Sequence, residues 1–473
     1  MAGRAATLPR SEPGSFRDPD SRVYRSDGRI LRMMSAQGAA DWKRFSSSAL
    51  YNELSSEGKI VETREVFDPQ LSNGALGADV AAVLEHEVVP FISYPYEWTF
   101  SMLQDAALLQ LELVRRSIDE GMILKDSSPY NVQFRAGRPI FIDLGSFEPL
   151  REGQPWAGYR QFCMLFLYPL LLEAWKGVPF QAWLRGSLAG ITPGECRAVL
   201  SRRDLLRRGA LTHVALHAML ERRHRETDAD IKGELGEAGF RKELIVANVR
   251  SLERLVSRLQ WRPKSSAWSG YEPTTSYSDA DAERKEQFVA QALAAERPRL
   301  VWDLGCNDGR FARIAAETAD VVVAVDADAA VVDRLYKALK AEGATKILPL
   351  TMDLADPSPG LGWRGAERQP LPARGHPDFA LCLALIHHIS IGGNVPVAEF
   401  LDWLRDLSTA LVIEFPTPED PMVRRMLVRK RAGNHPDYRR DWFERCLGER
   451  FSVTRSEVLS SGTRVLYHAR PRI

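Results

Sequence analysis

The sequence predicts two domains of different class, an α+β domain followed by an α/β domain with a largely parallel sheet. Three observations lead to this prediction. The 473 residues exceed what one hydrophobic core usually holds. From residue 300 onward, short apolar runs alternate with amphipathic helical stretches, which indicates a parallel sheet with helices on both faces. The first half instead combines a hairpin signal, short strands and long helices.

These patterns divide the chain into four parts. Residues 1–21 are rich in Ser, Pro, Gly and charge, so we expect a flexible N-terminus without a signal peptide. Residues 22–220 form the α+β domain and residues 275–473 the α/β domain. Between them, residues 221–274 are predicted to be a helical linker and hinge, with a bridging helix in its middle and a Trp-, Ser- and Pro-rich end.

Composition excludes several classes of function. The net charge is +1, from 63 basic and 62 acidic residues, which gives no clear nucleic-acid signature. The five cysteines form no C-x-x-C pair, so we expect neither a structural metal site nor a disulfide framework. The most apolar run, residues 162–172, is too short to span a membrane. We expect a cytoplasmic protein, whose oligomeric state the sequence leaves unknown.

The first domain opens with a hairpin around Ser26-Asp27-Gly28. A helix is predicted over 40–56, and strands over 59–67 and 83–92. A connecting strand over 93–98 and a long helix over 98–120 follow. Residues 156–220 read as helical throughout. The basic cluster that follows them, Arg222 to Arg225, is interpreted as a solvated helix end because acidic residues lie within a few positions.

The loop after the long helix carries polar residues at a distinctive spacing. Asp126 lies five residues before Asn131, and the next strand ends in Asp143-Leu-Gly. This pattern resembles the catalytic loop and metal-binding turn of kinase-like and aminoglycoside-phosphotransferase-like folds. The resemblance implies a kinase-like domain that binds Mg-ATP. Asp126 would accept the substrate's proton, while Asn131 and Asp143 would hold Mg²⁺.

Other features of the first domain depart from the kinase pattern. Leu124-Lys125 stands where His-Arg usually precedes the aspartate, there is no Gly-rich loop, and Lys59 comes after the helix that should follow the phosphate-binding lysine. Arg32 could pair with Glu53 in its place, although arginine is a poor substitute for lysine at such a site. The alternatives are a kinase-like scaffold that has lost phosphoryl transfer, and an unrelated fold.

The second domain is predicted to alternate strands and helices from one end to the other. A glycine-bracketed turn follows the first strand and opens a helix at about residue 310. The expected elements are strands at 300–302, 321–325, 345–351, 379–385 and 410–415, helices at 281–295, 310–317, 329–342 and 396–407, and a closing antiparallel pair at 451–455 and 464–469.

Acidic residues stand at three successive strand ends, Asp303, Asp326 and Asp353. An acid at the end of the second strand is placed to accept ribose hydroxyls. The turn reads Asp-x-Gly-x-x-x-Gly from Asp303 to Gly309, and it lacks the central glycine that admits a dinucleotide pyrophosphate. The other interpretation of Asp326 is an N-cap for the following helix, a role that Asp328 could equally serve.

The segment from Trp268 to Ile473 resembles the class I S-adenosylmethionine-dependent methyltransferases, which have a Rossmann-like sheet. The resemblance implies that Asp303, Gly305, Asn307 and Gly309 line the methionine moiety of S-adenosylmethionine. It also implies that Asp326 binds the ribose, and that Asp353, with Met352 packing nearby, binds the adenine. The whole chain is similar to bacterial nodulation-type methyltransferase proteins.

Candidate catalytic residues follow the fourth and fifth strands. His387 and His388 suit general-base work, and Glu414 lies where a substrate pocket should open. The alternatives are one core and one rim histidine, and a glutamate that is satisfied in a salt bridge. Many methyl transfers need little acid or base help because a sulfonium is already a strong electrophile, so positioning can carry most of the rate.

The leading hypothesis is a methyltransferase acting on a small-molecule or glycan-like acceptor. Two alternatives remain, a bifunctional kinase-methyltransferase and a noncatalytic nucleotide-sensing scaffold. The sequence does not identify the acceptor atom, because residues 261–277 and the segment after Glu414, which would build the pocket, carry no decisive signature.

Overall fold

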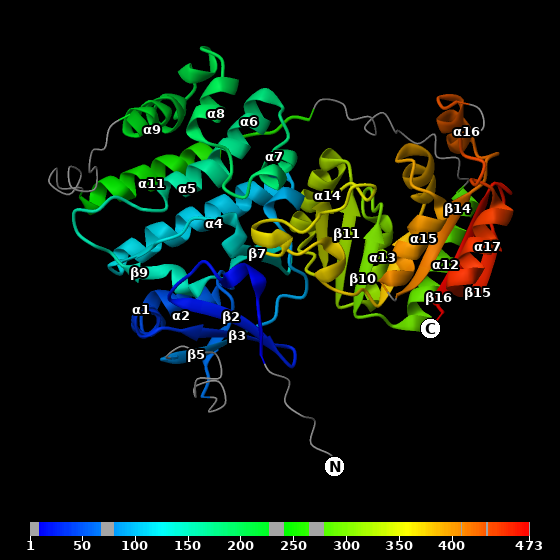
Figure 1. Ribbon diagram of the computed structural model, residues 1–473, viewed down its shortest axis with the longest axis horizontal. Coiled ribbons are helices and arrows are strands. Elements are labelled where there is room, and N and C mark those ends of the chain that lie inside the picture. Colours follow the sequence, from blue (N-terminus) through cyan, green and yellow to red (C-terminus); the bar gives the residue numbers. More distant parts are fainter. Residues whose placement is uncertain are drawn as a thin grey trace. The chain divides into compact units, whose positions relative to one another are not determined.

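The computed structural model describes residues 9–67, 80–226, 241–263, 279–407, 409–431 and 434–472 (Figure 1). The chain divides into two compact units. The first unit comprises Met1–Arg262 together with Gly360–Arg368, and the second comprises Pro263–Pro359 together with Gln369–Ile473. A short segment from the second half of the chain, residues 360–368, therefore belongs to the first unit. The Trp-, Ser- and Pro-rich end of the predicted linker and hinge lies mostly outside the described residues.

An antiparallel sheet opens the first unit. Its strands run in the order β1-β2-β3-β5-β4, with the bounds β1 (Arg10–Ser11), β2 (Ser21–Ser26), β3 (Arg29–Met34), β4 (Thr63–Glu65) and β5 (Ala82–His86). The predicted hairpin is confirmed, because β2 and β3 pair around a turn in which Asp27 and Gly28 have φ of 48° and 80°. Both residues of this turn lie in the left-handed region that a two-residue hairpin requires.

Two predictions for this region were wrong in detail. The single helix expected over 40–56 is two helices, α1 (Ala36–Ser46) and α2 (Ala49–Ser56). The break comes where the Ser48 hydroxyl accepts from the Tyr51 N–H and caps α2. The connecting strand expected over 93–98 is a short 3-10 turn, η2 (Pro95–Glu97), because the Glu97 carboxylate turns back to accept from the Tyr94 N–H.

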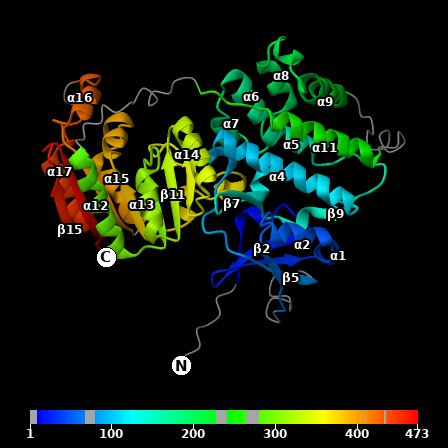
Figure 2. The ribbon, with the colours of Figure 1, turned by 180° about the vertical axis from the view of Figure 1, so that it is seen from behind.

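The long helix α4 (Phe100–Asp119) forms the centre of the first unit, and α11 (Lys242–Val256) packs along it. The Gln104 side chain on α4 donates to the carbonyls of Val256 and Leu259 at 2.7 and 3.0 Å. The helix expected to bridge the two halves thus lies within the first unit (Figure 2).

Two small antiparallel pairs follow α4 and carry the loop that contains Asp126 and Asn131. The strands β6 (Met122–Leu124) and β9 (Phe147–Pro149) pair with each other, as do β7 (Val132–Arg135) and β8 (Arg138–Phe141). Turns η3 (Pro129–Asn131) and η4 (Leu144–Ser146) lie between them. The remaining elements are helical: α5 (Tyr159–Phe162), η5 (Cys163–Leu167), α6 (Tyr168–Lys176), α7 (Gln181–Gly186), α8 (Pro193–Val199), η6 (Asp204–Leu206), η7 (Leu211–Leu216) and α9 (His217–Glu226).

The second unit is built on one seven-stranded sheet in the order β12-β11-β10-β13-β14-β16-β15. Its strands are β10 (Leu300–Leu304), β11 (Val321–Asp326), β12 (Ile347–Thr351), β13 (Phe379–Cys382), β14 (Ala410–Pro416), β15 (Phe451–Val458) and β16 (Arg464–Pro471). The first five are parallel, whereas β16 is antiparallel to both of its neighbours. The predicted Rossmann-like alternation and the closing antiparallel pair are both present.

Helices cover both faces of this sheet, with the bounds α12 (Asp279–Glu296), α13 (Arg310–Thr318), α14 (Ala329–Glu342), α15 (Val397–Asp406), α16 (Pro421–Val428) and α17 (Arg440–Arg450). The core against α12, α13 and α14 takes Ala410 and Val412 from β14. Phe415 points to the opposite face, because strand residues alternate, and there it stacks on Phe443 of α17 at 4.5 Å.

Between β12 and β13 the chain forms only the short turns η8 (Trp363–Gly365) and η9 (Leu371–Ala373). This connection contains residues 360–368, which belong to the first unit. No helix in the described ranges is long and apolar enough to cross a membrane. All five cysteines are buried as free thiols.

Candidate functional site

The turn after β10 is held in a conformation that only glycine adopts easily. Gly305 and Gly309 have φ of 84° and 79°, and the Gly305 N–H donates to the Val325 carbonyl at 2.8 Å. A Cβ added to Gly309 would lie 2.6 Å from Leu335 Cδ1. Asn307, between the two glycines, is also left-handed, with φ of 46°. The turn therefore brings backbone close to the carboxyl ends of the strands, where α13 begins.

Asp326 ties this turn to the neighbouring strand end. One carboxylate oxygen accepts from the Asn307 N–H and the other from the Asp328 N–H, both at 2.9 Å. The N-cap of α14 is Asp328, which accepts from the N–H groups of Ala330 and Val331. The cap and the strand-end acid are thus different residues. Each oxygen of Asp326 keeps a second lone pair, which a ribose hydroxyl can use.

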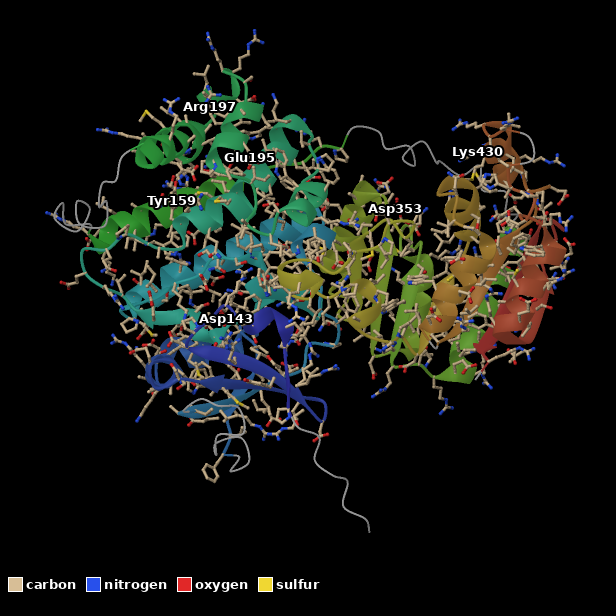
Figure 3. The ribbon with its side chains drawn as sticks, viewed as in Figure 1. Asp143, Tyr159, Glu195, Arg197, Asp353 and Lys430 are labelled. Atoms are coloured by element: carbon tan, nitrogen blue, oxygen red, sulfur yellow. The ribbon has the colours of Figure 1, made fainter. Side chains whose placement is uncertain are left out.

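Asp353 follows the third strand and is exposed (Figure 3). Its carboxylate accepts from the Ala355 N–H at 2.9 Å, which closes a tight turn. Met352, directly before it, is buried and donates its N–H to the Asp326 carbonyl. The structure therefore brings together the ends of β10, β11 and β12, with all three acids on the same edge of the sheet.

Asp303 is almost fully buried at the end of β10, and one of its oxygens has no hydrogen-bond partner among the described residues. Burial, and then the charge of Asp326, raise the pKa of its carboxyl group to about 7. An unsatisfied buried acceptor is costly to the fold. A cationic group bound beside the turn would supply the missing partner.

A buried ionic network underlies this edge of the sheet. Glu414 on β14 has no exposed surface, and its two oxygens accept from Lys285 at 2.7 Å and from Arg464 at 3.1 Å. Arg464 also binds Asp420 at 2.7 Å. Burial lowers the pKa of Lys285, and Glu414 opposes that effect. This arrangement agrees with the interpretation of Glu414 as a salt-bridge residue, because cationic side chains of the protein bind both of its carboxylate oxygens.

The two histidines lie at the start of a π-helical turn, η10 (His388–Gly392). Their rings are 4.0 Å apart. His387 is buried, and within the part of the chain that the structure describes its Nδ1 has no hydrogen-bond partner. Burial lowers the pKa of His388 to about 4, and burial with the neighbouring ring lowers the pKa of His387 well below its usual value. Both rings are therefore neutral near pH 7, and π-turns of this kind are frequent at functional sites.

Both carboxylate oxygens of Asp143, one of the three residues that the kinase resemblance singled out, are engaged by neighbouring side chains. Arg32 contacts Asp143 at 2.8 Å, and Ser146 donates to the other oxygen of Asp143. The predicted pairing of Arg32 with Glu53 was wrong, because Glu53 pairs with Arg116 instead. Asp126 lies near Asp143, and burial followed by the charge of Asp143 raises its pKa.

Asn131 ends η3, where its backbone N–H donates to the Ser128 carbonyl. Within the described ranges, no group of three or more His, Cys, Asp or Glu residues is arranged to hold a metal ion.

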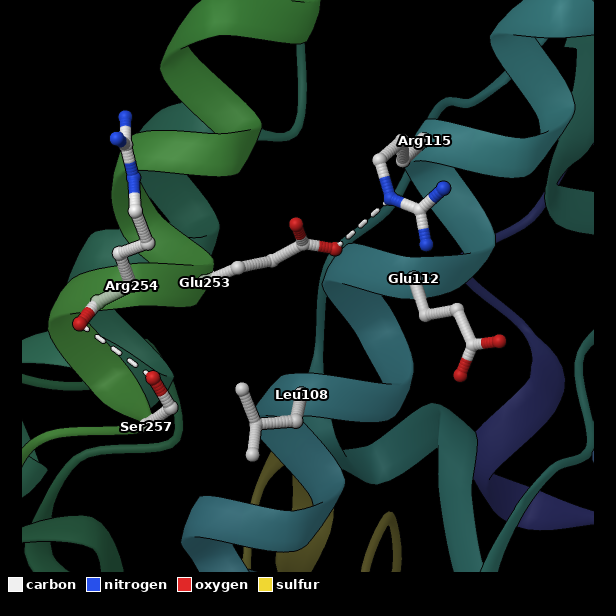
Figure 4. A pocket seen from close by; sticks show the side chains of 6 residues that line it. All are labelled: Leu108, Glu112, Arg115, Glu253, Arg254 and Ser257. Atoms are coloured by element: carbon white, nitrogen blue, oxygen red, sulfur yellow. Dashed lines mark hydrogen bonds and ion pairs between the residues drawn. The ribbon is translucent and has the colours of Figure 1, made fainter.

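Two pockets lie on the first unit, away from the residues described above. One, of about 300 Å³, opens between α4 and α11 (Figure 4). The ion pair between Arg115 and Glu253, 3.1 Å long, crosses it, and Leu108 forms part of its floor. The other, of about 440 Å³, lies over α8 and α9.

Comparison with known proteins gives one long match. No protein-family model matches the chain. The nodulation protein NoeA of Rhizobium meliloti (strain 1021) is 35% identical over 468 residues, which cover 98% of this chain and 96% of that protein.

Solved structures match over a smaller part of the chain. The N-methyltransferase NodS from Bradyrhizobium japonicum WM9 matches with a TM-score of 0.31 and 11% identity, over 41% of this chain and 99% of that one. The magnesium protoporphyrin IX methyltransferase ChlM from Synechocystis PCC 6803, with bound SAH, matches with a TM-score of 0.29 and 22% identity, over 40% and 83%. Values this low tell nothing about the substrate of this chain.

Proposed function

The chain belongs to the family of the nodulation protein NoeA, and we propose that its second unit transfers a methyl group from S-adenosylmethionine to a small-molecule or glycan-like acceptor. One observation carries the proposal. A glycine turn with left-handed backbone and three acids, Asp303, Asp326 and Asp353, occupy three adjacent strand ends of a Rossmann-like sheet. Ligands of open α/β sheets bind at this edge.

Each part of the cofactor has a residue suited to it. The unpartnered oxygen of Asp303 fits the ammonium of the methionine moiety, beside Gly305, Asn307 and Gly309. Asp326 would accept from the ribose hydroxyls, and Asp353 from the adenine amino group, with Met352 against the ring. When bound, S-adenosylmethionine supplies a methyl group on a sulfonium, which is already a strong electrophile.

The two histidines are the candidates for handling the acceptor's proton. Because both rings are neutral near pH 7, either one would accept a hydrogen bond, or a proton, from an acceptor N–H or O–H group. Glu414 is assigned a positioning role, since Lys285 and Arg464 already engage its two oxygens.

Isothermal titration calorimetry with S-adenosylmethionine and S-adenosylhomocysteine tests the cofactor assignment. We expect saturable heat for both. Folded protein that gives no saturable heat with either compound would remove the proposal. Acceptor-dependent formation of S-adenosylhomocysteine would dispose of the alternative of a noncatalytic sensing scaffold.

For the first unit, the order of elements supports a kinase-like fold. A small antiparallel sheet, a long helix, and two strand pairs carrying Asp126, Asn131 and Asp143 follow in sequence. Phosphoryl transfer from Mg-ATP fits less well, because the Arg32 guanidinium occupies the Asp143 carboxylate that would hold the metal. ATP binding that requires Mg²⁺ and is lost in Asp143→Ala would favour the bifunctional enzyme, whereas binding that survives this change would count against it.

A further inference from the structure

Exposed apolar side chains gather in one short stretch of the first unit. Thirteen large hydrophobic side chains are exposed among the described residues, and five of them fall within residues 206–220: Leu206, Leu211, Leu216, Met219 and Leu220. Leu206 is 87% exposed and Leu211 is 66% exposed. We call these five side chains the apolar surface. Such a concentration of exposed apolar side chains is typical of a surface that binds a partner.

Four of the five side chains share one side of a continuous helix, which η7 and α9 form together. η7 is a π-turn with i→i+5 hydrogen bonds, so Leu211 lies on the same side of the helix as Leu216. α9 has α-helical spacing, so Met219 and Leu220, three and four residues further on, fall on that side too. The other side carries His213, which is buried. The helix therefore packs on the unit with one side and presents apolar side chains on the other.

Arginine residues border the apolar surface at both of its ends. Six of them are exposed, four around η6 at the start and two in α9 at the end: Arg202, Arg203, Arg207, Arg208, Arg222 and Arg223. The two acidic residues between them are already engaged. Asp204 is buried and binds Lys176 at 3.0 Å, and Glu221 pairs with Arg160. The exposed charge around the apolar surface is therefore positive, although the chain as a whole carries a net charge of only +1.

A tryptophan and a hollow adjoin the apolar surface. The Arg207 guanidinium lies 5.1 Å from the centre of the Trp175 ring. The hollow of about 440 Å³ over α8 and α9 is lined by Met219 and also by Arg197 and Arg222. In Figure 1 and Figure 2, α8 and α9 lie at the end of the first unit opposite β2 and β5, and Figure 3 labels Arg197 there. Cationic and apolar groups are thus available side by side at this end of the unit.

We propose that this end of the first unit docks on an anionic membrane surface, where the apolar surface enters the boundary between headgroups and acyl chains and the arginines contact lipid phosphates. The proposal concerns the first unit and goes beyond the methyltransferase function of the second. Burial of apolar side chains and attraction to anionic lipids act together in such binding. Arginine forks match the geometry of a phosphate, and tryptophan settles readily at a membrane boundary.

Two other occupants fit the apolar surface less well. A second copy of the chain would bring arginines against arginines in either orientation, because both ends of the apolar surface are basic, and like charges that face each other across an interface are costly. A single-stranded nucleic acid would contact the arginines, but its bases stack on aromatic side chains, and the five side chains of the apolar surface include none. An anionic lipid surface is the occupant that engages both the arginines and the leucines.

The test measures cosedimentation of the full chain with two kinds of vesicle, one of phosphatidylglycerol and phosphatidylcholine in equal parts and one of phosphatidylcholine alone. We expect binding to the first kind, weakened by added salt, and little binding to the second. The variant Leu206→Ser/Leu211→Ser removes the two most exposed members of the apolar surface. The matched control, Phe67→Ser/Val88→Ser, removes two exposed apolar side chains elsewhere on the first unit. Affinity should fall about ten-fold or more in the first variant and stay at the wild-type value in the control.

A second pair of variants tests the charge. Arg202→Gln/Arg208→Gln removes two of the exposed arginines at the start of the apolar surface, and Arg138→Gln/Arg151→Gln removes two exposed arginines elsewhere on the first unit. Affinity for the vesicles that contain phosphatidylglycerol should fall about ten-fold in the first variant only. All the side chains that are changed are exposed, so the thermal unfolding midpoints should stay close to that of the wild type.

Three outcomes overturn the proposal. The first is a wild-type chain that stays in the supernatant with vesicles that contain phosphatidylglycerol at low ionic strength. The second is equal affinity of each variant and its control for those vesicles. The third is a dimer in sedimentation equilibrium that Leu206→Ser/Leu211→Ser dissociates, because it assigns the apolar surface to a second copy of the chain.

Discussion

At the scale of single residues, Asp303 links the chemistry of the site to pH. Its folded pKa of about 7 lies above the value of 3.8 for an exposed aspartate. The folded state therefore binds more protons than the unfolded state between these two pH values, and stability must fall as pH rises through that window. We expect Asp303→Asn to flatten this dependence, as measured by thermal unfolding between pH 5 and pH 8.

The same carboxyl group predicts proton release on cofactor binding. A bound ammonium favours the ionised form of Asp303, so near pH 6.5 each binding event should expel part of a proton. The calorimetric enthalpy should then differ between imidazole and PIPES, which both buffer near this pH and have different ionisation enthalpies. If S-adenosylmethionine binds with the same enthalpy in both buffers, the pairing of Asp303 with the ammonium group of the cofactor is contradicted.

The histidine pair predicts an unusual pH profile. Since burial holds the pKa of His388 at about 4, methyl transfer should be level from about pH 6 upward and should fall only as pH approaches that value. If His388 accepts the acceptor's proton, His388→Gln should lower kcat by about 10²-fold or more while cofactor affinity stays the same. If His388→Gln leaves kcat unchanged, His388 has a packing role and does not accept the proton.

At the scale of elements, buried ion pairs join α12, β14 and β16. Glu414 on β14 binds Lys285 of α12 and Arg464 of β16. Removing one member of a buried ion pair leaves a charge without compensation. We therefore expect Glu414→Ala to cost about 3–5 kcal/mol of unfolding free energy. Glu342→Ala, which breaks the exposed pair with Arg313, serves as the control and should cost less than about 1 kcal/mol. Equal losses in urea titrations would contradict this account.

Some of these elements could be predicted from the sequence alone, and others could not. The βα alternation, the hairpin at Asp27-Gly28 and the closing antiparallel pair were predictable, because each depends on local periodicity or turn chemistry. The break between α1 and α2 depends on one serine cap, and the turn at 95–97 on one glutamate that folds back. Lys285 and Arg464 could not be found as partners of Glu414, since residues so far apart in the chain meet only through the fold.

At the scale of the whole molecule, the first unit is discontinuous in sequence, because it includes residues 360–368 from the second half of the chain. Glu367 accepts from Arg17 through two hydrogen bonds, and the Arg368 guanidinium lies 4.3 Å from the centre of the Tyr130 ring. Tyr130 directly precedes Asn131. The segment that follows Asp353 in the chain thus contacts the residue before Asn131, which no local pattern could predict.

This arrangement predicts an asymmetric pair of variants. Glu367 is nearly buried and also accepts from the Trp363 N–H, so Glu367→Ala should cost about 1–3 kcal/mol. Arg17 is mostly exposed, and Arg17→Ala should cost less than about 1 kcal/mol. Hydrogen exchange over residues 12–23 and 360–368 should accelerate more in the first variant. The reverse order would contradict the role assigned to Glu367.

The central claim, that the strand-end acids bind S-adenosylmethionine, is tested most directly by comparing Asp326→Ala with Asp328→Ala in calorimetric titrations of that compound. Asp328 caps α14, so its loss should cost about 1 kcal/mol of stability and leave affinity nearly unchanged. If Asp326 holds the ribose hydroxyls, its loss should weaken binding by about 1–3 kcal/mol. Equal affinity in the wild type and Asp326→Ala would contradict the account.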